Sequence, residues 1–525
     1  MAVGPCILAI DLGTSGPKVA LVSVKGAVLD SAFAPTQLLL FPGGGAEQDP
    51  EGWWRAVVAA TRQMLAGRPE EANEIVAVAV TAQWSGTVPV DREGRPLGNA
   101  HIWMDSRGAS VIAEATDGVL PIKGNGLFKL IRWLRLTGGV PGASGKDAIA
   151  HILYLRKHSP ELYERTFKFL EPTDWLNARL TGRLAASYAS ITLYWATDNR
   201  DLSRVRYDDK ILSWYGIDRE KLPELHPTTD VLGPVLPSVA EELGIPATAR
   251  VVMGAPDMHA ATVGAGAVAD GVAQLYVGTS SFITGHVPFK KADLTHSIAT
   301  LPSALPDRYL AASTQETAGL CASHLIDQLV YPDDELATAP RPTDAYERLD
   351  RAVAQVPPGA DQLLFLPWLY GERTPVEDAT LRGGFLNLSL KTTRRHLARA
   401  VLEGVALNSR WSLGYLEKLM GRRQESLAMI GGGARSEQWC QIHADVFGIP
   451  VKQVANPVQA NAQGVGFLAL LSLGYLKRED LPGCVRVART WEPRPAYRAL
   501  YDDLFGAFLE TYRRNRKLFA RLNRQ

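Results

Sequence analysis

Short apolar runs that end in glycine-containing turns recur along this 525-residue chain. The first run, Ile7–Ile10, is followed after one turn by the apolar stretch 18–24, so residues 7–30 predict a β-hairpin or meander. Residues 75–80 are apolar without interruption, which is typical of a strand buried on both faces. Val251–Met253 predicts a further buried strand.

Helical patterns lie between these strands. Asp49 followed by Pro50 predicts an N-cap and the first turn of a helix whose apolar face continues to Leu65. A long helical pattern covers 394–420 and stops at Gly421, and shorter ones cover 438–446 and 461–474. Residues 117–150 are rich in glycine and residues 332–345 in proline and aspartate, so both segments are expected to be irregular surface insertions.

The order strand, hairpin, strand, helix, strand occurs twice. A chain of this length exceeds what one hydrophobic core holds, so at least two domains are expected. The repeated order favours an α/β protein with two domains of the actin-like ATPase type and a cleft between them. We place the domains at residues 1–268 and 269–480, and expect residues 481–525 to form a helical tail that packs on the core.

Composition narrows the class of protein. The chain is 46% hydrophobic and 21% charged with a net charge of +1, which is ordinary for a globular protein and argues against nucleic acid as the main partner. The basic residues of 509–525 are interpreted as a solvated helix face rather than a partner-binding tail. Four scattered cysteines and no apolar run of roughly 18 residues predict a cytoplasmic protein with reduced thiols and no membrane partner.

Two turns of similar sequence suggest where a polyphosphate binds. Gly13-Thr14-Ser15 follows the first strand, and Gly278-Thr279-Ser280 follows the apolar run 272–277. Such turns expose backbone N–H groups and hydroxyls, which suit phosphate oxygens, although turn capping is the simpler role. Lys18 either reaches the same phosphates or is a solvated strand lysine.

Two carboxylates lie near these turns in the sequence. Asp257 ends Gly254-Ala255-Pro256-Asp257, just before the second turn, where a phosphoryl acceptor would need a base; a helix N-cap is the alternative. Asp11 directly precedes the first turn and could hold Mg²⁺, which takes one or two carboxylates together with phosphate oxygens. The pattern as a whole predicts an ATP-dependent kinase.

Further motifs give the chain a family resemblance over nearly its whole length. They are Asp11–Gly16 with Lys18, Glu47–Pro50, Trp103–Arg107, Glu171–Trp175, Leu180–Gly182, Gly254–Asp257, Gly371–Pro375, Glu403–Val405 and Gly431–Ser436. In this order the chain resembles the FGGY carbohydrate kinases, most closely their xylulokinase-like branch. The resemblance implies two ribonuclease-H-like domains joined by a hinge, with sugar mainly on the first and ATP mainly on the second. It also implies that Asp257 is the catalytic base and that Asp11 helps to hold Mg²⁺, to which Asp257 would contribute.

The resemblance also implies the binding residues. For the sugar they are Gln83, Trp84, Ser85, Trp103, Asp105 and Arg107 together with Asp257; for ATP they are Gly13, Thr14, Ser15, Lys18, Gly278, Thr279, Ser280, Gly432, Gly433, Ala434 and Asn461. Asp105 and Arg107 have a structural ion pair as their alternative role, and Trp84 that of a buried indole. Xylulokinases usually show Gly-Gln-Met-His-Gly where this chain has Ala82-Gln83-Trp84-Ser85-Gly86, which leaves the sugar open.

The leading hypothesis is a kinase that uses ATP and Mg²⁺ to phosphorylate a hydroxyl of a ketose or polyol. A sugar- and nucleotide-binding regulator with weak catalysis is one rival, and an actin- or Hsp70-like ATPase whose output is domain motion is another. A small-molecule sugar or polyol is the expected partner, and a homodimer remains open.

Overall fold

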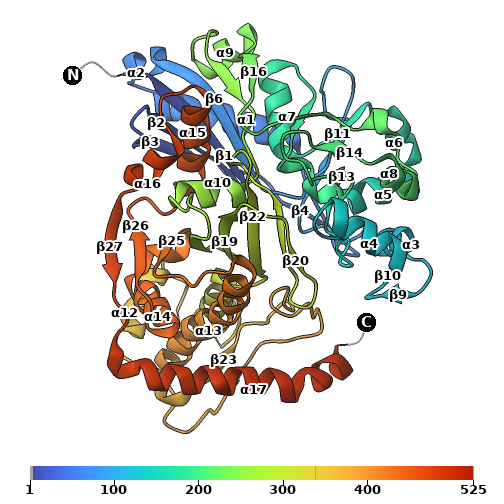
Figure 1. Cartoon of the computed structure of the whole chain (residues 1–525). Coiled ribbons are helices and arrows are strands. Elements are labelled where there is room, and N and C mark those ends of the chain that lie inside the picture. Colours follow the sequence, from blue (N-terminus) through green and yellow to red (C-terminus); the bar gives the residue numbers. More distant parts are fainter. Residues whose placement is uncertain (1–3, 337–338, 524–525) are drawn as a thin grey trace.

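Two mixed β-sheets form the framework of the protein. The computed structural model describes residues 4–336 and 339–523. The first sheet has the order β16 (Val231–Pro234), β17 (Arg250–Val252), β6 (Ile75–Ala82), β1 (Cys6–Gly13), β2 (Gly16–Ser23) and β3 (Val28–Phe33). Within it β17, β6 and β1 run parallel, and β1–β2–β3 is the predicted meander. This sheet belongs to the N-terminal half, above the C-terminal half in Figure 1.

The second sheet repeats the first one's central arrangement. Its order is β20 (Ala292–Asp293), β21 (Ile298–Pro302), β22 (Tyr309–Gln315), β19 (Ser281–Val287), β18 (Ala273–Val277), β25 (Leu427–Ile430), β26 (Val451–Val454) and β27 (Val487–Trp491). Here β18, β25 and β26 run parallel, and β18 pairs with β19 in antiparallel fashion across the second Gly-Thr-Ser turn. Both predicted phosphate turns therefore connect two antiparallel strands at the carboxyl edge of a parallel core.

Alternating side chains of β1 divide the first core between two helical layers. Leu8 and Ile10 lie in one cluster with the tryptophans of α1 (Pro50–Leu65) and α7 (Pro172–Thr181), whereas Ile7 and Ala9 pack on α15 (Ala460–Ser472). The N-cap of α1 is the predicted one, because the Asp49 carboxylate accepts a hydrogen bond from the Glu51 N–H.

Helix α10 (Asp257–Gly264) lies between the two sheets. It packs against α15, against β6 of the first sheet and against β18 and β19 of the second. The helix pair approaches closely, since a Cβ at Gly264 would lie 1.8 Å from the Ala460 carbonyl oxygen and a Cβ at Gly464 would lie 1.9 Å from that of Ala260. Helix α15 lies within residues 269–480, the predicted second domain, but it packs on the first sheet, as Figure 1 shows.

The remaining elements surround this framework. The longest are α13 (Arg394–Met420), as predicted, and α17 (Arg498–Leu522), which runs along the base of the molecule in Figure 1. The other helices are α2 (Pro69–Asn73), α3 (Ala109–Thr116), α4 (Leu127–Leu136), α5 (Ala148–His158), α6 (Pro160–Arg165), α8 (Asp209–Tyr215), α9 (Pro237–Leu243), α11 (Gly319–His324), α12 (Ala345–Val353), α14 (Glu437–Phe447) and α16 (Leu481–Cys484). Short sheets join β4 (Leu39–Phe41), β5 (Gly45–Gln48) and β8 (Ala100–His101); β7 (Val88–Val90) and β11 (Lys168–Leu170); β9 (Pro121–Ile122) and β10 (Asn125–Gly126); β12 (Ala185–Ser187) and β15 (Glu224–His226); β13 (Thr197–Asp198) and β14 (Arg206–Tyr207); and β23 (Leu364–Leu366) and β24 (Gly384–Leu386).

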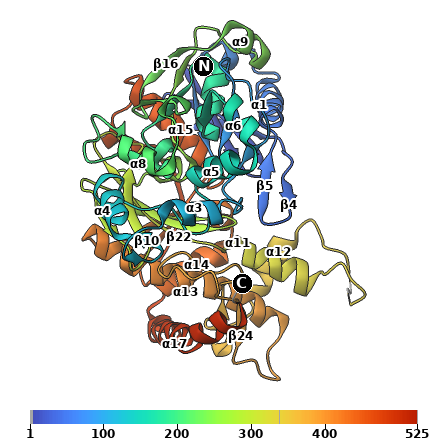
Figure 2. The same ribbon diagram turned by 90° about the vertical axis from the view of Figure 1, so that its right-hand side faces the viewer.

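The expectation that 117–150 is irregular is wrong. The segment contains the hairpin β9–β10, all of α4 and the start of α5, and Trp133 of α4 is fully buried in a core cluster. Glycines on both sides of α4 and its exposed Phe128 concealed the helical period. The segment 332–345 has no regular structure in its described residues until α12 begins at Ala345. Together with α12, this segment projects to one side in Figure 2. Residues 337–338 lie outside the described part of the chain.

The C-terminal tail is helical as expected but also contains a strand. β27 pairs with β26 and completes the second sheet, while α17 packs against α14 and β23. Residues 524–525 of the tail lie outside the described part of the chain. Chains that join a sheet edge in this way cover backbone groups that would otherwise be unpaired.

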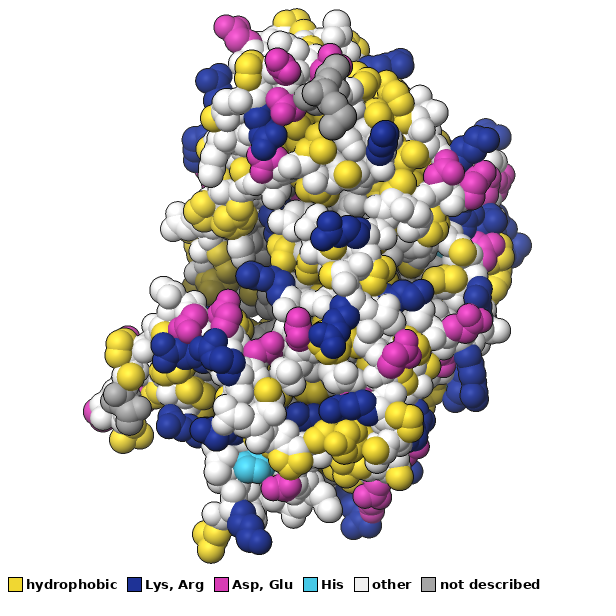
Figure 3. Space-filling model, turned by 90° about the vertical axis from the view of Figure 1, so that its left-hand side faces the viewer, with side chains coloured by type: hydrophobic (Ala, Val, Ile, Leu, Met, Phe, Trp, Pro, Cys, Tyr) yellow, Lys and Arg dark blue, Asp and Glu magenta, His cyan; other side chains and the backbone are white. Residues whose placement is uncertain are grey.

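Charges of both signs are mixed on the surface. Figure 3 shows basic and acidic side chains interspersed on one face, which is hollowed where the two halves of the molecule meet. Within residues 4–336 and 339–523, no helix has the length and apolar character needed to span a bilayer.

We expect Gly464→Ala to destabilise the protein, because the new methyl group would overlap the Ala260 carbonyl oxygen of α10. Overpacking of this kind costs about 1–3 kcal/mol in the free energy of unfolding, which urea denaturation measures. Gly506→Ala in α17 is the matched control: its Cβ meets nothing within 4 Å, so the substitution should be neutral or stabilise by up to about 1 kcal/mol. Equal effects of the two substitutions would contradict the close helix contact.

Candidate active site

Three of the predicted site residues lie at one edge of the first sheet. Asp11 is on β1, Gln83 directly follows β6, and Asp257 follows β17 and begins α10. Since β1, β6 and β17 are parallel, their carboxyl ends meet at the same edge. The turn before Asp257 needs glycine, because Gly254 has φ +69° and a Cβ there would lie 2.0 Å from the Val80 carbonyl oxygen.

Two carboxylates and one ammonium group form the centre of this edge. Lys18 Nζ lies 3.0 Å from Asp11 Oδ2, and the negative charge of Asp11 raises the pKa of Lys18. Asp257 accepts a hydrogen bond of 2.7 Å from the Met258 N–H. Burial, together with the nearby charge of Asp11, raises the pKa of Asp257 to about 7. Two carboxylates close together are also the type of donor set that Mg²⁺ takes, so Asp11 and Asp257 fit that ion.

The second sheet supplies the opposite side of the site. The turn Gly278–Ser280 follows β18, and its backbone is held by α11, since the Gly319 N–H donates to the Gly278 carbonyl. Thr279 is exposed, whereas Gly278 and Ser280 are half-buried. In the matching turn of the first sheet, Ser15 is exposed. Gly13 lies beside the Lys18 ammonium group, because a Cβ at Gly13 would be 3.6 Å from Lys18 Nζ.

The glycine triplet lies next to the second turn. Gly431 follows β25 with φ +87°, and a Cβ there would lie 2.5 Å from the Val277 carbonyl oxygen at the end of β18. Gly432 is exposed and Gly433 half-buried, but the methyl group of Ala434 is fully buried, and its carbonyl accepts a hydrogen bond from Gln453. Asn461 is in the first turn of α15, close to this edge because the Gly431 N–H bonds the Pro457 carbonyl.

A hydrogen-bond network fixes the polar groups of the predicted sugar site. The Thr14 hydroxyl donates to Gln83 Oε1 at 3.1 Å and accepts from Trp103 Nε1 at 2.9 Å. Gln83 Nε2 donates to Gln48 Oε1 at 2.7 Å, and Gln48 Nε2 donates to the Thr14 carbonyl at 2.8 Å. Thr14, predicted for ATP, thus bonds two residues predicted for sugar. Gln48 is a central member that the sequence reasoning did not select, although it belongs to the motif Glu47–Pro50.

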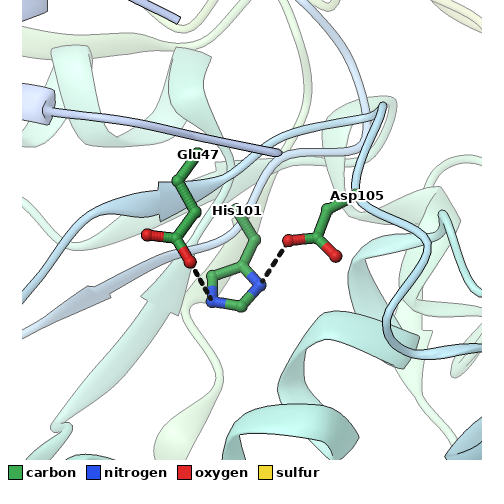
Figure 4. A group of neighbouring side chains, drawn as sticks. All are labelled: Glu47, His101 and Asp105. Carbon is green, nitrogen blue, oxygen red and sulfur yellow. Dashed lines mark ion pairs between the residues drawn. The ribbon is translucent and has the colours of Figure 1, made fainter. Parts of the chain in front are cut away.

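Asp105 and Arg107 form an ion cluster away from solvent. Arg107 Nη2 lies 2.5 Å from both Glu47 Oε1 and Asp105 Oδ2, and Figure 4 shows His101 between the same two carboxylates. Burial would raise the pKa of the Asp105 carboxyl, but hydrogen bonds from His101 and Arg107 outweigh it and hold the pKa well below its usual range. Glu47, His101 and Asp105 have metal-ligand spacing, yet Arg107 already contacts both carboxylates. The contacts match the structural alternative for Asp105 and Arg107.

Trp84 and Ser85 directly follow Gln83, and the side chain of each donates a hydrogen bond to a backbone carbonyl. Trp84 Nε1 donates to the Ser190 carbonyl at 3.0 Å, and its ring meets the ring of His259 edge-on at 4.9 Å between centroids. His259 is fully buried, and its Nε2 bonds the Pro302 carbonyl of β21 in the other half. Ser85 has a positive φ of 67°, and its hydroxyl donates to the Lys146 carbonyl at 2.7 Å.

Two further features of the site include residues that were not among the predicted site residues. Tyr276 of β18 stacks on Phe282 with 4.4 Å between ring centroids, and its hydroxyl would lie 2.6 Å from a Cβ at Gly278. Lys146, Glu316 and Arg373 meet across the two halves beyond Ser85. Arg373 belongs to the motif Gly371–Pro375, but the motif does not show what Arg373 contacts. Lys146, Glu316 and Arg373 are distant in the sequence and meet only in the folded chain.

Comparisons with known proteins identify the family of the chain. Residues 6–264 match the N-terminal domain, and residues 273–473 the C-terminal domain, of the FGGY family of carbohydrate kinases. The chain belongs to the FGGY family. It is therefore a carbohydrate kinase, and the predicted resemblance is confirmed.

Individual FGGY proteins cover the whole chain. The xylulose kinase of Bacillus subtilis (strain 168) is 27% identical over 516 residues, which is 98% of this chain and 97% of that protein. The crystal structure of xylulose kinase from Rhodospirillum rubrum has a TM-score of 0.82 at 27% identity and covers 98% of this chain and 99% of that one. The gluconate kinase of Lactobacillus acidophilus, at 24% identity and a TM-score of 0.85 with 99% of each chain covered, shares the fold. The predicted two-domain α/β fold is confirmed.

We expect Arg107→Met to lower the stability of this FGGY kinase even without substrate. It leaves the fully buried Asp105 without its cationic partner, and breaking a buried pair typically costs about 3–5 kcal/mol in the free energy of unfolding. Arg55→Met is the control, since Arg55 pairs with Asp49 at the surface and such pairs contribute about 0–1 kcal/mol. Denaturant unfolding of the two variants measures the difference; similar losses would argue against a structural role for the cluster.

Proposed function

We propose that this FGGY kinase transfers the γ-phosphoryl group of ATP to a hydroxyl of a ketose or polyol, with Asp257 as the general base. The carrying observation is the position of Asp257. It begins the helix that lies between the two sheets, beside Asp11 and close to Lys18, and its pKa is raised to about 7. A carboxyl group with this pKa can take up a proton near neutral pH and release it again after each turnover.

The residues around Asp257 have complementary tasks in this proposal. Asp257 accepts the proton of the attacking hydroxyl and orients its oxygen toward the phosphorus atom. Asp11 and Asp257 would hold Mg²⁺, which when bound neutralises charge on the phosphate oxygens. The backbone N–H groups of the turns at 13–15 and 278–280 bind phosphate, together with Lys18, while Gly432, Gly433, the Ala434 backbone and Asn461 border the adenosine.

The sugar is proposed to bind beside the network around Gln83. The bonds from Thr14 and Gln48 fix the orientation of the Gln83 amide, and the bond to Thr14 fixes Trp103, so neither side chain needs to be ordered on binding. Trp84 and Ser85 complete this wall, and Asp105 and Arg107 support it from behind. Closure of the two halves about α10 would exclude water that competes for the phosphoryl group.

The test is ADP formation with Mg-ATP across a panel of pentuloses, hexuloses, polyols and the corresponding sugar acids. Turnover that depends on one of these compounds is the expected result. ATP binding with no compound above background would favour the regulator, and hydrolysis that is indifferent to every sugar would favour an ATPase that couples to domain motion.

We expect Asp257→Asn to lower kcat by about 10²–10⁴, because the amide cannot accept the hydroxyl proton. The variant should keep its stability and its affinity for ATP, which separates a catalytic loss from unfolding. Asp503→Asn makes the same chemical change on the exposed face of α17 and should leave kcat unaltered. A kcat for Asp257→Asn within threefold of the wild type would exclude Asp257 as the base.

The pH profile gives a second expectation. Asp257 acts as a base only when ionised, and its pKa of about 7 lies above the ordinary value for aspartate. We therefore expect kcat/KM to be constant at high pH and to fall about tenfold per pH unit below pH 7, as Asp257 becomes protonated. Rates measured from pH 5.5 to 9 test this; a flat profile down to pH 5.5 would contradict it.

A further inference from the structure

Lys146 is a buried lysine whose ammonium group has a carboxylate partner only at long range. The residue is 8% exposed, yet within the described part of the chain its Nζ makes no hydrogen bond. The closest opposite charge is Glu316 Oε2 at 3.9 Å, and the ring of Tyr370 lies 4.6 Å away. Burial lowers the pKa of Lys146, and Glu316 opposes this only in part. A desolvated cation with so little compensation is costly unless a ligand completes its environment.

The position of Lys146 connects it to the proposed sugar site. Its backbone carbonyl accepts the hydrogen bond from Ser85, the last residue of the predicted sugar-binding run. Trp84, the residue before, contacts the ring of His259, which is two residues beyond Asp257 in α10. The backbone of Lys146 is therefore linked to the start of α10 through the neighbouring residues Ser85 and Trp84.

The loop that carries Lys146 is held firmly. A Cβ at Gly145, which has φ +69°, would lie 2.0 Å from the Ala109 nitrogen. Asp147 Oδ2 accepts hydrogen bonds of 2.7 Å from the Gly142 N–H and from Trp195 Nε1. The backbone is therefore fixed on both sides of Lys146, and with it the point from which the side chain extends.

Two cations share one carboxylate beside Lys146. Arg373, from the other half, donates to Glu316 Oε1 at 2.9 Å, so one carboxylate serves two cations. Burial raises the pKa of the neighbouring Glu372 to about 8, and its oxygens are engaged elsewhere: Oε1 accepts from the Glu316 and Arg373 N–H groups, and Oε2 accepts from Asn408. Asp147 directs its carboxylate to Gly142 and Trp195, and Glu377 is exposed to solvent.

We propose that Lys146, together with Arg373, binds a carboxylate of the substrate, so that the preferred acceptor is a polyhydroxy acid of the aldonate class rather than a neutral sugar. The inference rests on the proposed function, since it concerns the far end of the same acceptor. A carboxylate at Lys146 would restore the solvation lost by the ammonium group and form charge-assisted hydrogen bonds. It would also connect the two halves, because Lys146 and Arg373 come from opposite sides of the cleft.

The test compares acidic and neutral acceptors of equal length. D-gluconate and D-xylonate are assayed against D-glucitol, xylitol and D-xylulose with Mg-ATP. We expect kcat/KM to be at least about tenfold higher for an aldonate, and Lys146→Met to lower that value by about 10–100-fold, as loss of a charge-assisted hydrogen bond predicts. The neutral acceptors should change less than threefold in the variant. Lys391→Met, at an exposed lysine, is the matched control.

Other outcomes overturn the inference. They are an equal or higher kcat/KM for a neutral acceptor, a parallel loss for both classes in Lys146→Met, or a change in the KM for ATP alone. Calorimetric titration of D-gluconate without ATP separates this inference from the proposed function. Lys146-dependent binding without any turnover would keep the carboxylate site and reject the kinase proposal; neither binding nor turnover would reject both.

Discussion

Close packing of α10 against α15 between the two sheets is the constraint on which the rest of the structure depends. The helices can approach only because residues 264 and 464 are glycine, so that each backbone rests on the carbonyl of the other helix. This contact fixes the start of α10, and with it Asp257, at the carboxyl edge of the first sheet. It also brings the turns of the second sheet opposite, because α10 packs on β18 and β19 as well.

Two aspartates of the N-terminal half, Asp105 and Asp257, have pKa values that are shifted in opposite directions. Around Arg107, hydrogen bonds satisfy the Asp105 carboxylate so fully that its pKa falls and the group stays ionised. At the site edge, Lys18 bonds Asp11 and leaves Asp257 with burial and a neighbouring negative charge, which raise its pKa. The first arrangement stabilises a fixed structure. The second leaves a carboxyl group free to exchange a proton, which is what a general base requires.

In the proposed function, the acceptor side of the cleft combines neutral and charged recognition. The amide and indole network around Gln83 suits hydroxyl groups and is already ordered before binding. Beyond Ser85, Lys146 and Arg373 present two cations to one carboxylate of Glu316. These groups come from both halves of the chain. A substrate that contacts both can therefore use part of its binding energy to close the two halves on each other.

The sequence by itself determined many of the elements, the two-domain α/β fold and the turns that carry the predicted site residues. Strand periodicity, the Asp49 cap and the turns after buried strands are local signals. Local signals failed where flanking glycines concealed α4, and they could not place β27 in a sheet. Only the tertiary structure decided that α15 returns to the first sheet, that Arg107 belongs to a buried ion cluster and that Lys146 meets Glu316. Burial, pKa and contacts between distant segments arise from the packed chain, and no window of sequence contains them.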